Sequence, residues 1–131
     1  MRLTIVLFVI LFGSTAVGAP CDGIDRSLSA EAKLMLAPVI AKQLQTTAVD
    51  LLSSLKSGAW TILYVNPHDA DEAFLFYSGD PLTSRYVTLW AGAATRDEES
   101  SIRKWVQANA PDAPPALAEC FAWYVTKGRA H

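Results

Sequence analysis

Basic residues are sparse and scattered along this chain of 131 residues. The sequence has 11 Lys and Arg residues against 13 Asp and Glu residues, which gives a formal net charge of −2 at pH 7. Nucleic-acid-binding surfaces usually carry a stripe of Lys and Arg, and single-strand binders add interleaved aromatic residues. Neither pattern is present, so we expect no nucleic-acid partner.

Familiar catalytic motifs are also missing. The chain has only two histidines, His68 and His131, and it lacks the Gly-x-Ser-x-Gly elbow, the His-Glu-x-x-His pair and the phosphate-binding loop. A general acid–base pair would have to come from carboxylates, for example Asp71 or Glu72 with Asp80. Such a small hydrolase is an alternative, but the sequence favours a protein that is not an enzyme and has no cofactor.

Only one long apolar run exists, at residues 3–12, directly after the basic Arg2. It is too short to span a bilayer comfortably, and the mostly small residues 13–19 follow it. A basic start, a short apolar run and a small-residue cleavage region are typical of a secretory signal peptide. The sequence therefore predicts a cleaved signal peptide at residues 1–19.

Cleavage would leave one domain, residues 20–131, that is periplasmic or secreted. Pro20 precedes Cys21 at a position where lipoprotein signals carry a small residue, which argues against a lipid anchor. No second apolar run approaches the length of a membrane span. We expect a soluble protein with no membrane contact after cleavage.

Cys21 and Cys120 are the only cysteines of the chain. In an oxidising compartment an isolated pair of this kind usually forms a structural disulfide. A metal site would need further ligands, and a redox pair would be spaced Cys-x-x-Cys. The sequence therefore predicts a disulfide between Cys21 and Cys120 and no metal at these residues.

A long N-terminal helix is expected to begin at Ala30, with Ser29 as its N-cap. Pro38 predicts a kink or a restart within it. Beyond the proline, apolar residues recur at helical spacing, namely Ile40, Leu44, Ala48, Leu51 and Leu55. Gly58 is a suitable residue for the end of this helix.

Three segments rich in aromatic and β-branched residues follow, separated by turn residues. They are residues 60–65, 72–78 and 85–91. Because the connections between neighbouring strands are short, they predict an antiparallel meander.

Two C-terminal helices complete the prediction. Thr95 and Glu98 have the spacing of a capping box for the first, which Pro111 ends. The second carries an apolar stripe formed by Leu117, Cys120, Phe121 and Tyr124. The expected fold class is α+β, with an N-terminal long helix, a three-stranded antiparallel meander and two C-terminal helices.

Both faces of the predicted sheet are apolar, one aliphatic and the other aromatic, which is not the pattern of a sheet with one face in water. In one interpretation helices cover both faces. In the other, part of the aromatic face stays open and binds a partner. The candidate partner-binding residues of that face are Tyr64, Phe76, Tyr86 and Trp90.

A second group of candidates lies in the turn at residues 66–72. It combines one imidazole and three carboxylates, namely His68, Asp69, Asp71 and Glu72. The turn would contact a partner or hold a cation, or it is an ordinary solvated hairpin turn. Its spacing matches no calcium-binding loop, and zinc would need more His or Cys residues, so no metal is expected.

Together these patterns favour a soluble exported protein that acts through a protein–protein interaction surface. Inhibitors and immunity-type proteins form one class of such proteins. The alternative is a binder of a small ligand or of cell-envelope glycan that uses the aromatic face of the sheet. The carboxylate hydrolase is the least favoured of the three.

Overall fold

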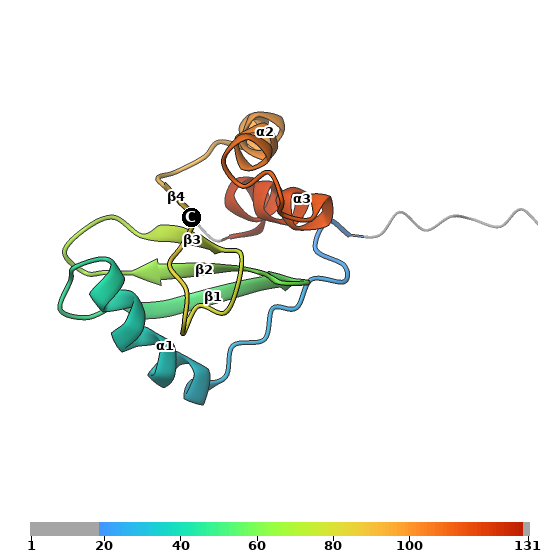
Figure 1. Ribbon diagram of the computed structural model, residues 1–131. Helices are drawn as coiled ribbons and strands as arrows, with labels where there is room; N and C mark the ends of the chain where they lie inside the picture. The colour runs from blue at the N-terminus through green and yellow to red at the C-terminus, as the bar shows by residue number, and fades with distance from the viewer. Residues whose placement is uncertain (1–18, 130–131) are drawn as a thin grey trace, which may run out of the picture.

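One helix, four strands and two further helices follow one another in the computed structural model, which describes residues 19–129 (Figure 1). Their bounds are α1 (Ala30–Gln43), β1 (Asp50–Ser57), β2 (Trp60–Asn66), β3 (Ala73–Tyr77), β4 (Thr88–Ala91), α2 (Glu99–Asn109) and α3 (Pro115–Trp123). A 3-10 turn, Arg96–Glu98, precedes α2, and a π-helical turn, Tyr124–Gly128, follows α3. The α+β class and the antiparallel meander are confirmed. The sheet has four strands, in the order β1-β2-β3-β4, and not the three that we predicted.

The start of α1 agrees with the sequence prediction. Ser29 has extended backbone, and its Oγ accepts a hydrogen bond of 3.0 Å from the backbone N–H of Ala32. This bond satisfies one of the N–H groups that the first turn of a helix leaves without a partner. The helix then continues through Pro38 and ends at Gln43.

The end of α1 shows that the predicted long helix was wrong. Gln45 adopts the left-handed conformation, with φ 55°. The N–H of Gln45 donates to the carbonyl of Lys42 at 3.2 Å, and the N–H of Thr46 donates to the carbonyl of Ala41 at 3.0 Å. These two bonds form the Schellman motif that ends many helices. Glycine usually takes the left-handed position, so a glutamine there gives no signal in the sequence.

The first strand, β1, occupies the segment that we predicted as the second half of the helix. Leu51 and Leu55 are both buried, and their spacing of four residues fits a helical stripe. In the strand, a β-bulge between Leu51 and Ser53 shifts the register, so that Leu51 packs on the α1 side and Leu55 on the opposite side. Gly58 does not end a helix. It has φ 58° and begins the two-residue turn between β1 and β2.

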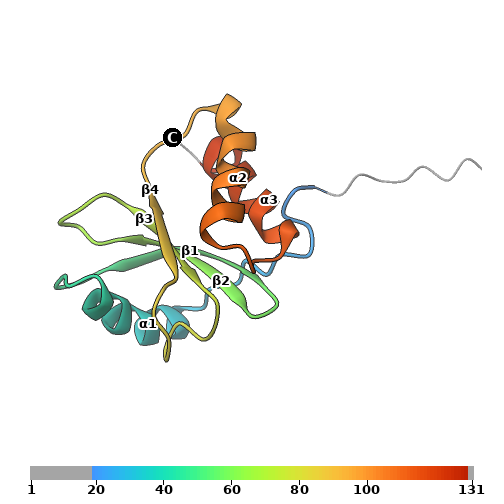
Figure 2. The same ribbon diagram turned by 45° about the horizontal axis from the view of Figure 1, so that its top comes forward.

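Helices cover both faces of the sheet (Figures 1 and 2). On one face, Ile40 of α1 packs with Leu63 and Leu75. On the other face lie α2 and α3, against the side chains of Tyr64 and Phe74, which are directly opposite each other in β2 and β3. The predicted division into an aliphatic and an aromatic face is therefore confirmed for β2 and β3. Of the two interpretations, the one with helices over both faces describes the fold.

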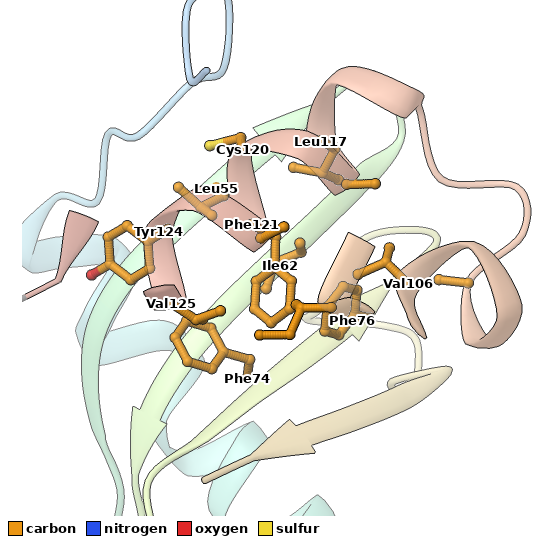
Figure 3. Packing of buried hydrophobic residues seen from close by; sticks show 14 of the residues in the cluster. Leu55, Ile62, Phe74, Phe76, Val106, Leu117, Cys120, Phe121, Tyr124 and Val125 are labelled. Atoms are coloured by element: carbon orange, nitrogen blue, oxygen red, sulfur yellow. The ribbon is translucent and has the colours of Figure 1, made fainter. Parts of the chain in front are cut away.

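Phe121 of α3 provides the central contact on the aromatic face (Figure 3). Its ring meets the rings of Phe74 and Phe76 nearly edge-on, with 5.0 Å between ring centroids in each pair. Aromatic rings favour this geometry because the positive edge of one ring meets the negative face of the other. The predicted stripe of the last helix is confirmed, since its four members are buried: Leu117, Cys120, Phe121 and Tyr124.

The signals for the ends of the C-terminal helices are also confirmed. The carboxylate of Glu98 accepts a hydrogen bond of 2.9 Å from the backbone N–H of Thr95, as a capping box requires. Helix α2 ends at Asn109, two residues before Pro111. A proline-rich connection follows, and α3 begins at Pro115. Proline suits a first helical position because its missing N–H would have no partner there in any case.

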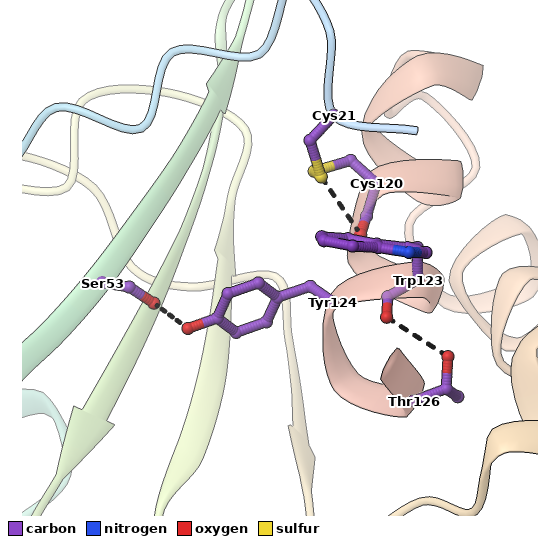
Figure 4. The surroundings of a disulfide bond; sticks show 6 residues. All are labelled: Cys21, Ser53, Cys120, Trp123, Tyr124 and Thr126. Atoms are coloured by element: carbon purple, nitrogen blue, oxygen red, sulfur yellow. Dashed lines mark hydrogen bonds between the residues drawn. A yellow bond between two sulfur atoms is a disulfide. The ribbon is translucent and has the colours of Figure 1, made fainter. Parts of the chain in front are cut away.

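The predicted disulfide joins Cys21 to Cys120 (Figure 4). The two residues are 99 positions apart, and Cys120 is fully buried in α3. The sulfur of Cys21 lies 3.6 Å from the carbonyl oxygen of Cys120, a contact that is no hydrogen bond because a disulfide sulfur carries no hydrogen. The bond fixes the segment before α1, in which Asp25 forms an antiparallel bridge with Lys56 at the edge of β1.

Disulfides persist in oxidising compartments, and the bond indicates such a compartment for this protein. The predicted signal peptide, residues 1–19, lies outside the described residues apart from Ala19. Among the helices of residues 19–129, none is long and apolar enough to cross a membrane.

Removing the disulfide is expected to lower the free energy of unfolding by up to about 4–5 kcal/mol, because closing so long a loop strongly reduces the entropy of the unfolded chain. Urea unfolding of the double variant Cys21→Ala/Cys120→Ala at pH 7 measures this loss. A reductant should destabilise the native protein by a similar amount and leave the double variant unchanged. A loss below about 1 kcal/mol would show that the bond does not constrain the unfolded chain in this way.

Tyr77 is expected to make the protein less stable at alkaline pH. Its hydroxyl donates to Oε1 of Gln43 at 2.8 Å, and burial raises the pKa of Tyr77 to about 12. The unfolded chain loses this proton near pH 10, whereas the native state keeps it, so the free energy of unfolding should fall between about pH 10 and pH 12. In Tyr77→Phe this alkaline slope should be shallower, and the lost hydrogen bond should cost about 1 kcal/mol at pH 7. Urea unfolding at a series of pH values tests both effects, and an unchanged slope would contradict the first.

Candidate functional site

Tyr64 and Trp90, two of the four aromatic candidates, lie at the same end of the sheet as the acidic turn, residues 66–72, which joins β2 to β3. The hydroxyl of Tyr64, in β2, donates a hydrogen bond to the carboxylate of Glu72, directly before β3. Two groups of residues that the sequence presents as separate candidates are therefore in direct contact.

Three aromatic side chains line up across the strands at this end. The register places Tyr64 opposite Phe74, and Phe74 opposite Trp90. The rings of Tyr64 and Phe74 are stacked, with centroids 4.2 Å apart and an angle of 4° between their planes, and Trp90 lies 5.9 Å from Phe74. Phe74 is buried, whereas Tyr64 and Trp90 are only partly buried.

Arg129 covers this row of rings. Its guanidinium carbon lies 5.7 Å from the ring centroid of Tyr64, 5.5 Å from that of Phe74 and 5.8 Å from that of Trp90. Each distance is within the range of a cation–π contact. Nη2 donates to the carbonyl of Gly92 at 2.8 Å, and Nη1 donates to the hydroxyl of Tyr64 at 3.3 Å. Nε of Arg129 is buried and has no hydrogen-bond partner within residues 19–129.

The π-helical turn after α3 positions this arginine. The N–H of Arg129 donates to the carbonyl of Tyr124 at 2.9 Å. A Cβ atom on Gly128 would lie only 2.5 Å from the indole ring of Trp123, so glycine is required for this close approach. An ion pair between Lys127 and Glu99 of α2 fixes the turn from the other side. The sequence analysis missed Arg129, because no local pattern links it to a tyrosine 65 residues earlier.

Tyr64 acts as a hydrogen-bond donor at this site. Burial raises the pKa of Tyr64, and its hydrogen bond to the Glu72 carboxylate raises it further, although the positive charge of Arg129 acts in the opposite direction. The phenol therefore remains protonated at neutral pH. It links the arginine to the carboxylate of Glu72 and is not activated as a nucleophile.

The acidic turn itself has a defined shape. His68 has left-handed backbone, with φ 65°, and its N–H donates to Oδ1 of Asn66 at 2.9 Å. Nε2 of His68 lies 3.0 Å from Oδ2 of Asp50 in β1. The hydroxyl of Thr46, after α1, donates to the carbonyl of Pro67 at 3.3 Å. The turn is thus fixed both to the first strand and to the end of the first helix.

A groove of about 300 Å³ lies beside this turn, and we call it the acidic groove. Its floor is mainly apolar, and two carboxylates line it on the side of the turn. The lining residues are Leu44, Thr46, Pro67, Asp69, Ala70, Asp71, Ala73, Leu89 and Ala91. Asp69 and Asp71 are both exposed, and neither forms an ion pair with the described part of the chain.

Phe76 and Tyr86 lie elsewhere. Phe76 is fully buried, with its ring against Phe121 and Trp105, and so it belongs to the core. The placement of Tyr86 on the aromatic face was wrong, because β4 begins only at Thr88. Tyr86 packs instead on the α1 side of the sheet, with its ring centroid 6.4 Å from that of Tyr77.

The proposed carboxylate pair is not formed. Asp71 and Glu72 precede β3, whereas Asp80 follows it. A strand of five residues is about 16 Å long, so the strand separates these carboxylates by its full length. Within residues 19–129 no group of three or more His, Cys, Asp or Glu side chains is arranged to hold a metal ion.

Replacing Arg129 tests the arrangement of this end of the sheet. Arg129→Ala should lower the free energy of unfolding by about 1–2 kcal/mol, because cation–π contacts and hydrogen bonds are lost. It should also move the indole N–H signal of Trp90 in a ¹H–¹⁵N NMR spectrum. Arg85→Ala, which removes an exposed arginine in the loop before β4, is the control and should change neither quantity. An unchanged Trp90 signal in Arg129→Ala would contradict the contact.

Comparison with known proteins adds no relative. No protein-family model matches the chain, no curated protein matches it, and no solved structure matches its fold.

Proposed function

We propose that this protein is exported and binds a partner protein through the acidic groove. The feature that carries the proposal is the combination of an apolar floor with two exposed carboxylates, Asp69 and Asp71, that have no cationic partner in the described part of the chain. Such a groove suits a lysine or arginine of the partner, whose aliphatic stem would lie on the floor while its charged head meets the carboxylates.

The turn that carries these carboxylates is held in shape before any partner binds. The contact of His68 with Asp50 and the hydrogen bond from Thr46 to Pro67 connect it to two other elements. A surface that is already ordered loses less conformational entropy when it binds. This supports a binding role for the turn over the alternative of an ordinary solvated loop.

The proposal of export rests on the signal-peptide pattern of residues 1–19 and agrees with the Cys21–Cys120 disulfide. Inhibitors and immunity-type proteins are small, stable domains that act by such binding, and we place this protein in that class by its mode of action. A glycan platform on the aromatic face has less support, because Phe76 is buried and Arg129 lies over Tyr64, Phe74 and Trp90.

Site-specific photo-cross-linking in the native envelope and secreted fractions tests the proposal. A photoreactive residue replaces Ala70, in the acidic groove, and in a control replaces the exposed Ala108 of α2. We expect one protein to be cross-linked from position 70 and not from position 108. Moderate salt should weaken the interaction, because exposed charges are screened.

The charge variants decide whether the acidic groove recognises that protein. Asp69→Asn/Asp71→Asn should weaken binding of the captured partner by roughly tenfold, equivalent to about 1.4 kcal/mol. Asp112→Asn removes an exposed carboxylate elsewhere and should leave the affinity unchanged. Capture that is equal from both positions, or an affinity that does not depend on Asp69 and Asp71, would contradict the proposal.

A further inference from the structure

A second hollow lies at the opposite end of the sheet, between α1 with the segment before it, the β1–β2 hairpin and the loop after β3. We call it the hairpin cleft. Its volume is about 300 Å³, near the lower limit for sites that bind small molecules. We propose that the hairpin cleft binds a free α-amino acid with an apolar side chain.

Apolar side chains form the inner part of the cleft. Leu28, Leu36 and Leu63 line it, and Met35 and Leu82 lie at its mouth. Met35 is 52% exposed and Leu82 is 36% exposed. Both are large apolar side chains, and they flank the same hollow from two different elements. A bound aliphatic or aromatic side chain would remove this surface from water, which is favourable. A volume of about 300 Å³ has room for a single amino acid.

Two largely buried residues that carry hydroxyl groups line the sheet side of the cleft. Ser54 is 6% exposed and Thr61 is 7% exposed, and both belong to strands whose register turns them toward α1. Neither oxygen is among the buried polar atoms without a partner in the described part of the chain, so both hydroxyls remain open to the cleft. They can therefore donate to a ligand with a hydrogen-bonding head in place of water.

Opposite charges lie at the polar end of the cleft. Lys56 and Asp80 line both the hairpin cleft and an adjoining hollow of about 420 Å³, so they lie where the two meet. Although they share this site, they do not form an ion pair with each other or with other described residues. The backbone N–H of Leu82 donates to Oδ1 of Asp80 at 2.9 Å and holds this carboxylate in place.

A third charge in the cleft, Asp25, is already satisfied. Its carboxylate accepts hydrogen bonds from the N–H and the hydroxyl of Ser27, and the hydroxyl bond in particular lowers the pKa of Asp25. Asp25 is therefore a fixed negative charge, and the positive charge of Lys56 also lowers the pKa of Asp25. The groups that remain available to a ligand are the Lys56 ammonium, which forms no ion pair with the described residues, one carboxylate oxygen of Asp80 and the two hydroxyls.

A zwitterion meets all of these requirements at once. The carboxylate of an α-amino acid would bind Lys56 and accept hydrogen bonds from Ser54 and Thr61. Its ammonium group would bind Asp80, and its side chain would extend between α1 and the sheet. A fatty acid would satisfy only the lysine, and an alkylamine only the aspartate. The charge pattern thus selects for a molecule with both groups.

Titration of the oxidised protein with L-leucine, followed by ¹H–¹⁵N NMR, tests the proposal. We expect saturable shifts at the backbone signals of Ser54, Lys56, Thr61 and Leu82. N-acetyl-leucine lacks the ammonium group and L-leucinamide lacks the carboxylate, so each should bind at least tenfold more weakly than leucine. These two compounds also separate a free amino acid from the C-terminal and N-terminal residues of a peptide.

Surface variants provide the matched controls. Lys56→Met and Asp80→Asn should each weaken leucine binding at least tenfold, and both change residues that are exposed, so the fold should be retained. Lys104→Met and Asp112→Asn make the same chemical changes away from the cleft and should leave binding unchanged. Thr61→Val removes one of the two hydroxyls and should weaken binding about fivefold.

Three results would overturn the proposal: no saturable shift at 20 mM leucine, equal binding of the acetylated or amidated compound, or binding that persists in both Lys56→Met and Asp80→Asn. The test is independent of the proposed protein-binding function. Asp69→Asn/Asp71→Asn should bind leucine normally, since the acidic groove lies at the other end of the sheet.

Discussion

A sheet with two apolar faces is unstable in water unless both faces are covered, and this requirement organises the whole molecule. On one face α1 supplies Ile40 against Leu63 and Leu75. On the other face α3 supplies Phe121, whose ring contacts those of Phe74 and Phe76 nearly edge-on. The disulfide then ties the segment before α1 to α3, so that the elements on the two faces are connected by a covalent bond as well as by the chain.

The sequence predicted the parts of this fold that depend on local patterns. The N-cap at Ser29, the capping box at Thr95, the strands β2 and β3 and the stripe of α3 all follow from residue types at short spacing. The end of α1 could not be predicted, because the left-handed Gln45 that ends it looks like any other glutamine in a sequence. Strand β1 was not predicted either. Its bulge places Leu51 and Leu55 on opposite faces, so two buried leucines four residues apart mimic a helix.

The candidate sites show the same limit. Tyr64, Trp90 and the acidic turn were identified from composition, and the sheet brings Tyr64 and Glu72 into contact. Arg129 could not be found in this way, because its partners come from strands far away in the sequence. The same holds for the hairpin cleft, where Ser54, Lys56 and Asp80 appear unremarkable until β1 is known to be a strand. Features that depend on long-range register are thus the ones that need the structure.

The position of the disulfide also affects how the protein can be made. A chain is synthesised from its N-terminus, and Cys21 precedes Cys120 by 99 residues. At a usual synthesis rate the earlier thiol exists for about 5–20 s before its partner has been made. During that interval it is available to oxidants and to the thiols of other molecules, and no later cysteine of its own chain can compete for it. The correct pairing is therefore unambiguous within one chain, and the hazard at this stage is a bond to another molecule.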